Sequence, residues 1–431
     1  LAPDLVPLFD AILTLPPPVA APEAPLQMLV TTLDYDDYVG RLAIGRLAAG
    51  RLRAGQELAV ATPGSVPRPV RSGDVYVFEN LKRTAVEEAG AGDIAAVAGL
   101  GEVTIGETIT SAEEPRPLPP IAVEAPTVRM AFMVNTSPVA GRDGQYASSR
   151  VLRERLHREA ERNVAMRVQD TDTPDVFVVS GRGELHLAIL VETMRREGHE
   201  FAVGRPEVIV REEMGQRMEP FEDAYIDVAE EYVGAAVELL GARRGLMLEM
   251  GRGTTDNIVS VRFRAPTRGL IGLRNRLLTA SKGTAVMHRL FHGYGQWAGD
   301  LPAREVGSIV AHVTGITTRN ALKLAEERGE LFVGPREDVY AGQVVGSTNR
   351  GTDLVFNVCR KKHLTNHRRS FAEEGIFLMP PVKMGVDEAI GYVGDDELVE
   401  VTPAGVRLRK RDLNHEGRQK AAKRKARESA G

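Results

Sequence analysis

A short basic segment holds the densest group of residues in this sequence that could do chemistry. Residues 360–369 contain five Lys or Arg and no acid. Cys359, His363 and His367 precede or interrupt these cations at intervals of four, a spacing that could place three metal ligands on one helix face. The surrounding positive charge repels a dication and no fourth ligand is evident. The pattern therefore favours contact with a polyanion such as RNA over a metal site.

A second basic stretch lies near the C-terminus. Between Arg407 and Arg427 there are ten Lys or Arg against Asp412 and Glu416, and because the whole chain carries −4, the remainder is strongly acidic. This asymmetry indicates a polyanionic partner, and a solvated charged tail is the alternative. Threonine and asparagine within the first segment could reach sugars or base edges. We predict these RNA-contacting residues: Arg360, Lys361, Lys362, His363, Thr365, Asn366, His367, Arg368, Arg369, Arg407, Arg409, Lys410 and Arg411.

Other chemical signatures are weak. A phosphate-binding loop needs G-x-x-x-x-G-K-[ST], and no Gly-Lys pair occurs in this sequence. Gly90-Ala91-Gly92 opens a partial dinucleotide fingerprint that fits a simple turn better. Asp170-x-Asp172 lacks the remaining positions of a calcium loop. The sequence also lacks H-E-x-x-H and G-x-S-x-G, so we predict no catalytic, cofactor-binding or metal-binding residues in this chain.

Composition sets broad limits on the protein. Its 431 residues, 43% hydrophobic and 26% charged, suit several globular domains. Cys359 is the single cysteine, so no intrachain disulfide can form. No apolar run reaches the length of a membrane span. We therefore expect a cytoplasmic protein that acts as a monomer without contacting a membrane.

The first part of the chain combines a short helical pattern with a β-rich region. Residues 1–24 begin with apolar residues at helical spacing and end in prolines, which predicts a short helix stopped by them. We interpret this stretch as the end of a preceding domain and its linker. From 25 to 115, short apolar segments alternate with Gly and Pro turns, a pattern typical of a β-barrel.

Two units of one topology are predicted next. Residues 126–211 show the order βαββαβ, with helices over 149–163 and 184–197. The same order recurs over 219–297, with helices over 232–240 and 270–281. This order indicates two ferredoxin-like α+β domains.

The last part is predicted to be β-rich and then irregular. Residues 298–412 contain several strand-like runs and one helix over 318–328. From 413 to 431 the chain is polar all round, which predicts a disordered basic tail or a segment that folds only on a partner. The fold class is therefore a multidomain α/β and β protein.

Several motifs resemble those of translational GTPases. GRLAIGRLAAGRLRAGQ at 40–56 resembles their barrel domain, a match shared by many elongation factors. TSPVAGRDGQYASSR at 136–150 and RAPTRGLIGLRNRLLTASKGTAVMHRLFHGY at 264–294 resemble, more specifically, the third and fifth domains of the BipA/TypA family. NVCRKKHLTNHRRS at 357–370 is similar to that family's C-terminal domain.

The spacing of the two ferredoxin-like units separates the candidate families. In elongation factor G a further domain lies between them, whereas here only residues 211–219 do. This excludes elongation factor G and leaves BipA/TypA and LepA. The C-terminal motifs favour BipA/TypA, and a LepA-like factor or a nucleotide-independent RNA-binding assembly chaperone remains the alternative.

The resemblance implies a GTP-dependent ribosome factor with roles in stress adaptation and in large-subunit assembly or translation. Its partners would be the large subunit and its rRNA, with A-site tRNA as a further candidate. GTP and Mg²⁺ would bind a GTPase domain preceding Leu1, so this chain alone should have no activity. The loop at 360–366 corresponds to the family's K-K-x-x-T-N element, which projects toward the tRNA and the peptidyl-transferase region.

Overall fold

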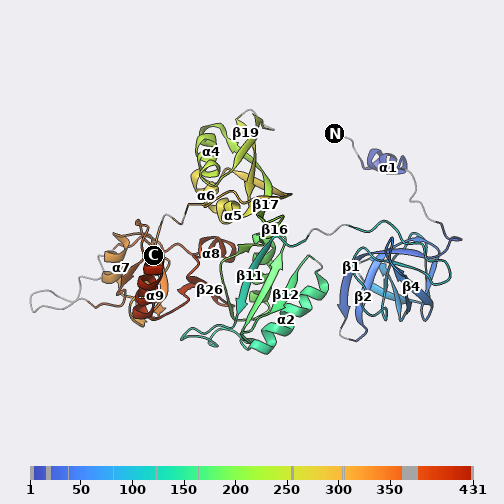
Figure 1. Ribbon diagram of the computed structural model, residues 1–431, viewed down its shortest axis with the longest axis horizontal. Coiled ribbons are helices and arrows are strands. Elements are labelled where there is room, and N and C mark those ends of the chain that lie inside the picture. The colour runs from blue at the N-terminus through green and yellow to red at the C-terminus, as the bar shows by residue number, and fades with distance from the viewer. Residues whose placement is uncertain are drawn as a thin grey trace, which may run out of the picture. The chain divides into compact units, whose positions relative to one another are not determined.

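In a computed structural model, the chain folds into two compact units, and each has its own strands (Figure 1). The structure describes residues 4–15, 21–36, 38–80, 82–121, 125–163, 165–253, 257–302, 304, 306–361 and 377–428. The first unit comprises residues 1–125 and 157–166, and the second comprises 126–156 and 167–431.

The first unit begins with helix α1 (Val6–Leu13), which confirms the predicted short helix and buries none of its residues. Ten short strands follow and surround one apolar core that includes Met28, Leu47 and Leu58. Eight of them pair in the order β5-β4-β10-β1-β2-β9-β6-β7, and β3 pairs with β8. Their bounds are β1 (Gln27–Asp36), β2 (Gly40–Ala49), β3 (Arg51–Arg53), β4 (Glu57–Ala61), β5 (Arg68–Arg71), β6 (Val75–Glu79), β7 (Lys82–Val86), β8 (Glu88–Gly90), β9 (Ile94–Val97) and β10 (Thr108–Ser111).

The second unit opens with the predicted βαββαβ order. Its strands pair in the order β12-β13-β11-β14, and α3 buries apolar residues such as Leu187 and Val191. The bounds are β11 (Val128–Met133), α2 (Ser149–Arg162), β12 (Arg167–Asp170), β13 (Val176–Gly181), α3 (Glu184–Arg196), β14 (Phe201–Val203) and β15 (Glu207–Val208). The last residues of α2, from His157 on, are grouped with the first unit.

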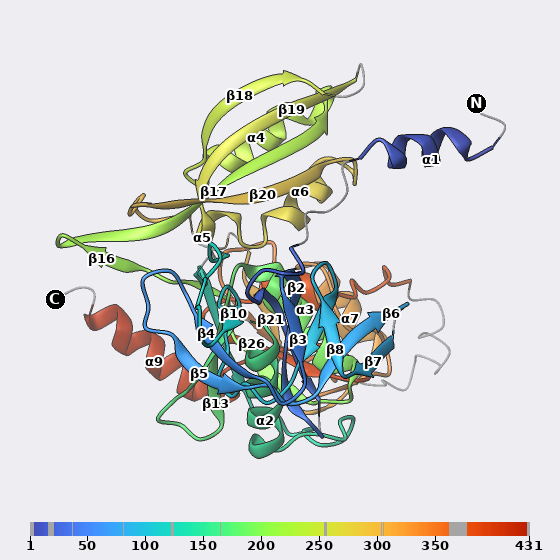
Figure 2. The same cartoon turned by 90° about the vertical axis from the view of Figure 1, so that its right-hand side faces the viewer.

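The second βαββαβ segment also follows the prediction. Its strands pair in the order β20-β17-β19-β18, β16 also pairs with β17, and α4 and α6 pack on the sheet through Leu240 and Leu277 (Figure 2). The bounds are β16 (Arg211–Glu213), β17 (Gln216–Ala229), a short 3-10 helix (Glu230–Tyr232), α4 (Val233–Gly241), β18 (Leu246–Arg252), β19 (Ile258–Pro266), α5 (Thr267–Leu270), α6 (Leu273–Ala280) and β20 (Val286–Gln296).

The C-terminal segment continues the sheet of the first βαββαβ segment. Strand β26 pairs antiparallel with β14, and the sheet then runs β27-β24-β21-β25. The bounds are β21 (Ser308–Ala311), β22 (Gly315–Ile316), α7 (Arg319–Glu326), β23 (Asp338–Val339), β24 (Gln343–Ser347), β25 (Leu354–Phe356), α8 (Val386–Tyr392), β26 (Glu397–Thr402), β27 (Gly405–Lys410) and α9 (His415–Glu428). One sheet therefore joins residues that the sequence analysis assigned to separate domains.

For residues 413–431 the prediction was a disordered basic tail or a segment that folds only on a partner, and helix α9 shows that residues His415–Glu428 are helical in the chain by itself. The side chain of Asn414 accepts from the backbone N–H of Glu416 at 3.0 Å and so satisfies a donor at the start of the helix. The helix itself is rich in Ala, Lys and Arg, which have high helix propensity even without an apolar face. Polarity alone was thus a poor guide to disorder here.

Candidate nucleic-acid interface

Helix α7 holds both ends of the segment that contains the predicted RNA-contacting loop. At its start, the Thr318 hydroxyl donates to the carbonyl of Arg360 at 2.8 Å. At its end, the Glu326 carboxylate accepts from the backbone N–H of Met379 at 2.6 Å. The pKa of Glu326 lies below its ordinary value, mainly because of the hydrogen bond from the Lys323 side chain and to a smaller extent because of the Met379 N–H. Both ends of the segment are therefore anchored by one helix.

Arg360 and Lys361 are exposed at the start of this segment. The other predicted residues of the loop lie outside the described residues: Lys362, His363, Thr365, Asn366, His367, Arg368 and Arg369. The role of the loop remains a prediction for them. Cys359 is half-buried, with its Sγ 4.0 Å from the carbonyl of Val313, and burial raises the pKa of its thiol.

Two of the predicted contacts on β27 are wrong. Arg409 and Lys410 are 2% and 1% exposed, because β27 is an interior strand between β26 and β24. Lys410 Nζ forms ion pairs with Asp396 at 2.9 Å and Glu397 at 3.0 Å, and also with Asp353. These two side chains cannot reach an RNA phosphate from where they lie.

The remaining residues of this stretch divide between internal and exposed positions. Arg407 is half-buried and forms ion pairs with Asp143 at 2.8 Å and Glu400 at 3.4 Å, so its charge is already balanced. Arg411 is exposed beyond the end of β27. Of the four cations predicted at 407–411, Arg411 is the one placed to meet a partner.

The Glu397 carboxylate lies at the centre of a buried charge cluster. It is fully buried, and it accepts from Arg304 at 2.8 Å and from the Ser308 hydroxyl at 2.6 Å in addition to its pair with Lys410. Burial would raise the pKa of Glu397, but Arg304 and Lys410 together hold it at about 2. This cluster stays charged at neutral pH and links β21, β26 and β27.

Two further buried carboxylates, Glu200 and Glu400, fix the loop 135–144. Glu200 accepts from the backbone N–H groups of Gly141 at 2.8 Å and Gly144 at 2.9 Å. Glu400 accepts from the Tyr340 hydroxyl at 2.5 Å, and the amide of Asn135 donates to both carboxylates, at 2.8 and 2.9 Å. The loop is therefore held by Glu400 of β26 as well as by Glu200, which directly precedes β14.

Helix α9 presents exposed basic residues in a stretch for which the sequence predicts a disordered tail. Lys420, Lys423 and Arg424 are exposed on it. Arg418 instead donates to the carbonyls of Asp412 at 2.7 Å and Leu413 at 3.0 Å, and so fastens the first turn of the helix. The helix propensity of this stretch was the signal that could have predicted it.

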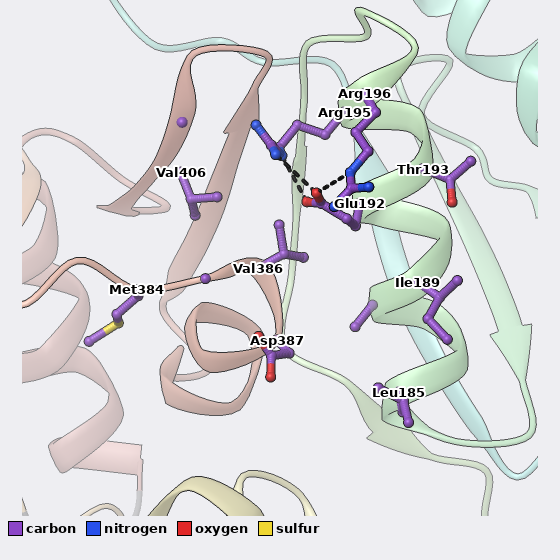
Figure 3. Close-up of a pocket in the computed structure, with 13 residues that line it drawn as sticks. Leu185, Ile189, Glu192, Thr193, Arg195, Arg196, Met384, Val386, Asp387 and Val406 are labelled. Atoms are coloured by element: carbon purple, nitrogen blue, oxygen red, sulfur yellow. Dashed lines mark hydrogen bonds and ion pairs between the residues drawn. The ribbon is translucent and has the colours of Figure 1, made fainter.

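A cavity of about 630 Å³ lies between α3 and α8 beside the β26–β27 hairpin (Figure 3). Leu185 and Ile189, one turn apart on α3, are each 57% exposed along it. Glu192 is paired with Arg195 at 2.8 Å and Arg196 at 2.7 Å, and these contacts lower its pKa to about 2. The cavity thus offers apolar contact beside a carboxylate whose charge is already balanced.

Three segments of the chain match known family models. Residues 25–112 match the model of elongation factor G domain 2, 216–305 match the elongation factor G C-terminus, and 306–415 match the TypA/BipA C-terminal domain. A protein of Synechocystis named "Large ribosomal subunit assembly factor BipA" is 46% identical over 94% of this chain and 68% of its own length. The chain belongs to the BipA/TypA family.

Two further relatives of this BipA/TypA chain come from different sources. The "Putative elongation factor TypA-like SVR3, chloroplastic" of Arabidopsis thaliana is 48% identical over 97% of this chain and 62% of its own length. The Bacillus subtilis "Large ribosomal subunit assembly factor BipA" is 41% identical over 97% of this chain and 68% of its own length. The chain thus spans about two thirds of the length of these relatives, and the three family matches include no GTPase domain.

A solved structure from Thermus thermophilus covers 68% of the chain and 59% of its own length at 18% identity and a TM-score of 0.42, a likeness too weak to carry an argument. In the described part of this BipA/TypA chain, no helix is long and apolar enough to cross a membrane. Among the same residues, no group of three His, Cys, Asp or Glu is placed to hold a metal ion, whereas His363 and His367 lie outside them.

Proposed function

We propose that this BipA/TypA chain is the ribosome-contacting and RNA-contacting part of a translational GTPase that acts in large-subunit assembly or translation and in stress adaptation. Large-subunit rRNA is the proposed partner, with A-site tRNA as a second. GTP and Mg²⁺ would be used by the whole protein, through residues that this chain does not supply. A cytoplasmic location remains a prediction, since one relative is named chloroplastic.

The observation that carries the proposal is the placement of exposed cations on anchored elements at the C-terminal end of the chain. Arg360 and Lys361 are exposed beside the hydrogen bond that Thr318 donates to the carbonyl of Arg360. Lys420 and Lys423 are exposed on helix α9. Cations held by a folded scaffold lose less conformational freedom on binding phosphates than cations on a free tail. The relatives named as large-subunit assembly factors support the same partner.

A double variant, Lys361→Ala with Lys362→Ala, tests the proposal. Loss of two phosphate contacts should weaken co-sedimentation with ribosomes. A plot of the logarithm of the association constant against the logarithm of the salt concentration should become less steep, its slope falling by about two. Exposed loop charges change stability by about 0.5 kcal/mol or less, so the melting temperature should stay close to that of the wild type. Lys82→Ala, in β7 of the first unit, is the matched control. Unchanged co-sedimentation of the double variant would contradict the role of the loop.

A further inference from the structure

We propose that an arginine-lined pocket in the second unit holds one unpaired nucleotide of a structured RNA, an inference that rests on the proposed RNA-binding function. The pocket has a volume of about 400 Å³ and lies between α4 and α6 on one side and α8 with Leu301, Pro302, Arg304 and Val306 on the other. This size is within the usual range of ligand pockets, roughly 300–1,000 Å³. Its apolar walls include Leu239, Ile271, Leu301 and Met384.

The charged lining of the pocket is strongly asymmetric. Five arginines line it, against the single acid Glu388, whose carboxylate already accepts from the backbone N–H of Gly385 at 2.9 Å. Three of the arginines are balanced by carboxylates that are not part of the lining: Arg268 by Glu219, Arg304 by Glu397 and Arg205 by Asp395. Arg243 donates to the carbonyls of Gly269 at 2.7 Å and Ile271 at 3.1 Å.

Arg276 is the lining arginine to which the described residues offer no hydrogen-bond or ion-pair partner. It is half-buried on α6, and no carboxylate of the described residues forms an ion pair with it. Arg274, two residues earlier on the same helix, lines a different cavity and lies 3.9 Å from Asp387. A helix turns by about 100° per residue, so the two side chains leave α6 in different directions. One cation therefore faces the pocket while a near neighbour does not.

The combination of apolar walls, guanidinium planes and the cation of Arg276, which has no carboxylate partner among the described residues, fits a nucleotide. A base can lie against apolar side chains and stack on an arginine plane, while its phosphate pairs with Arg276. Proteins recognise RNA sequence mainly at loops and bulges, because bases in a duplex are stacked and their edges are hard to reach. The expected ligand is thus a bulged or loop nucleotide rather than a paired one.

Trp297 provides a reporter for this pocket. It is the only tryptophan in the sequence, and the guanidinium carbon of the pocket residue Arg268 lies 3.7 Å from its ring centre. Arg217 lies at the same distance from the ring. A ligand that moves Arg268 should change the fluorescence of Trp297, and no label is needed on the protein.

The test is a titration of the 431-residue chain with an RNA hairpin carrying one bulged fluorescent base analogue, and with the same hairpin without the bulge. The wild type should bind the bulged hairpin more tightly, with a change in Trp297 emission. Arg276→Gln should weaken that binding about tenfold, the equivalent of about 1.4 kcal/mol. Arg274→Gln should bind like the wild type, and Arg276→Lys, which keeps the charge without the plane, should bind at an intermediate level. Melting temperatures of all variants identify any loss of folding.

Each contrary result has a distinct meaning. Equal binding of the two hairpins, or equal losses for Arg276→Gln and Arg274→Gln, would overturn the pocket assignment. If Lys361→Ala weakens binding of both hairpins while Arg276→Gln does not, the proposed function stands and the pocket proposal fails. If free AMP competes as well as the bulged hairpin, the pocket takes a free nucleotide and not RNA. Absence of all RNA binding by the wild type would overturn both proposals.

Discussion

At the scale of residues, cations that look alike in the sequence have opposite environments in the fold. Lys410 has its ammonium group among three carboxylates and is 1% exposed, whereas Lys361 is exposed. A buried ion pair gains attraction in a medium of low dielectric constant but loses hydration, so removal of one partner is costly. The buried cluster therefore contributes to the integrity of the sheet, and the exposed cations remain for a partner.

The variants Glu397→Gln and Asp396→Asn test this contrast. Both residues contact Lys410, but Glu397 is fully buried while the side chain of Asp396 is 65% exposed. Glu397→Gln should lower the free energy of unfolding by about 3 kcal/mol, because Arg304 and Lys410 lose their shared counter-charge. Asp396→Asn should cost about 1 kcal/mol or less. Urea denaturation of the three proteins measures the difference, and equal effects would contradict the importance of burial.

Acid should remove the contribution of the charged Glu397 carboxylate to the free energy of unfolding. Its pKa is lowered from 4.5 to about 2 in the folded protein, so its charged form stabilises the fold at pH values above the ordinary pKa. That contribution is lost as the pH falls from about 4.5 toward 2. The gap in unfolding free energy between the wild type and Glu397→Gln should narrow over this window. A gap that stays constant with pH would show that the variant acts through packing and not through charge.

At the scale of elements, short helices decide where the basic segments are held. Helix α7 supplies the contact at each end of the segment between residues 360 and 379. Leu413, just before α9, lies against Gly342, where a Cβ would come within 2.7 Å of its side chain. Gly342 also has φ of +89°, so a larger residue there would be strained as well as crowded. The start of α9 is therefore packed against the strand region that precedes β24.

Gln419→Pro tests whether the helical form of α9 matters for RNA binding. Proline inside a helix removes a backbone hydrogen bond and costs about 3 kcal/mol, enough to unfold a helix with few tertiary contacts. The far-ultraviolet circular dichroism signal of helix should fall, while the melting of the sheet changes little. Ribosome binding should weaken although every lysine and arginine is retained. Gln419→Ala is the control, and equal binding by Gln419→Pro would mean that the charges act as a free tail.

At the scale of the whole molecule, one sheet crosses the boundary that was predicted between residues 126–211 and 298–412. Strand β14 pairs with β26 through Phe201 with Val401, Ala202 with Glu400 and Val203 with Val399. All six side chains are fully buried; five are apolar, and the sixth belongs to the hydrogen-bonded network that includes Asn135. The two segments should consequently unfold together rather than as separate domains.

Val399→Asp should reveal this cooperativity in hydrogen exchange. Val399 is fully buried, and an unpaired carboxylate there should cost about 3 kcal/mol or more. Amide exchange should rise in β11 and β13 as well as in β26 and β27. Strands β1 and β2 of the first unit are the internal control and should exchange as in the wild type. Faster exchange confined to 397–410 would contradict a shared folding unit.

The sequence by itself determined the order of elements and the family. The βαββαβ order of both segments, the helices near 184–197 and 232–240, and the basic character of residues 360–369 all follow from local periodicity and composition. The family motifs could be recognised in the sequence because each is a continuous segment of the chain. Patterns of this kind lie within one short segment, so they can be recognised without knowing which distant segments pack against it.

Only the tertiary structure decided which of the basic residues are available. Arg407, Arg409 and Lys410 belong to a strand that could have been exposed, but β27 has β26 on one side and β24 on the other. Arg407 pairs with Asp143 and Lys410 pairs with Asp353, and these two carboxylates lie far away in sequence and come close only through the tertiary fold. Burial depends on which distant segments meet, and the spacing of residues within one segment carries no information about that meeting.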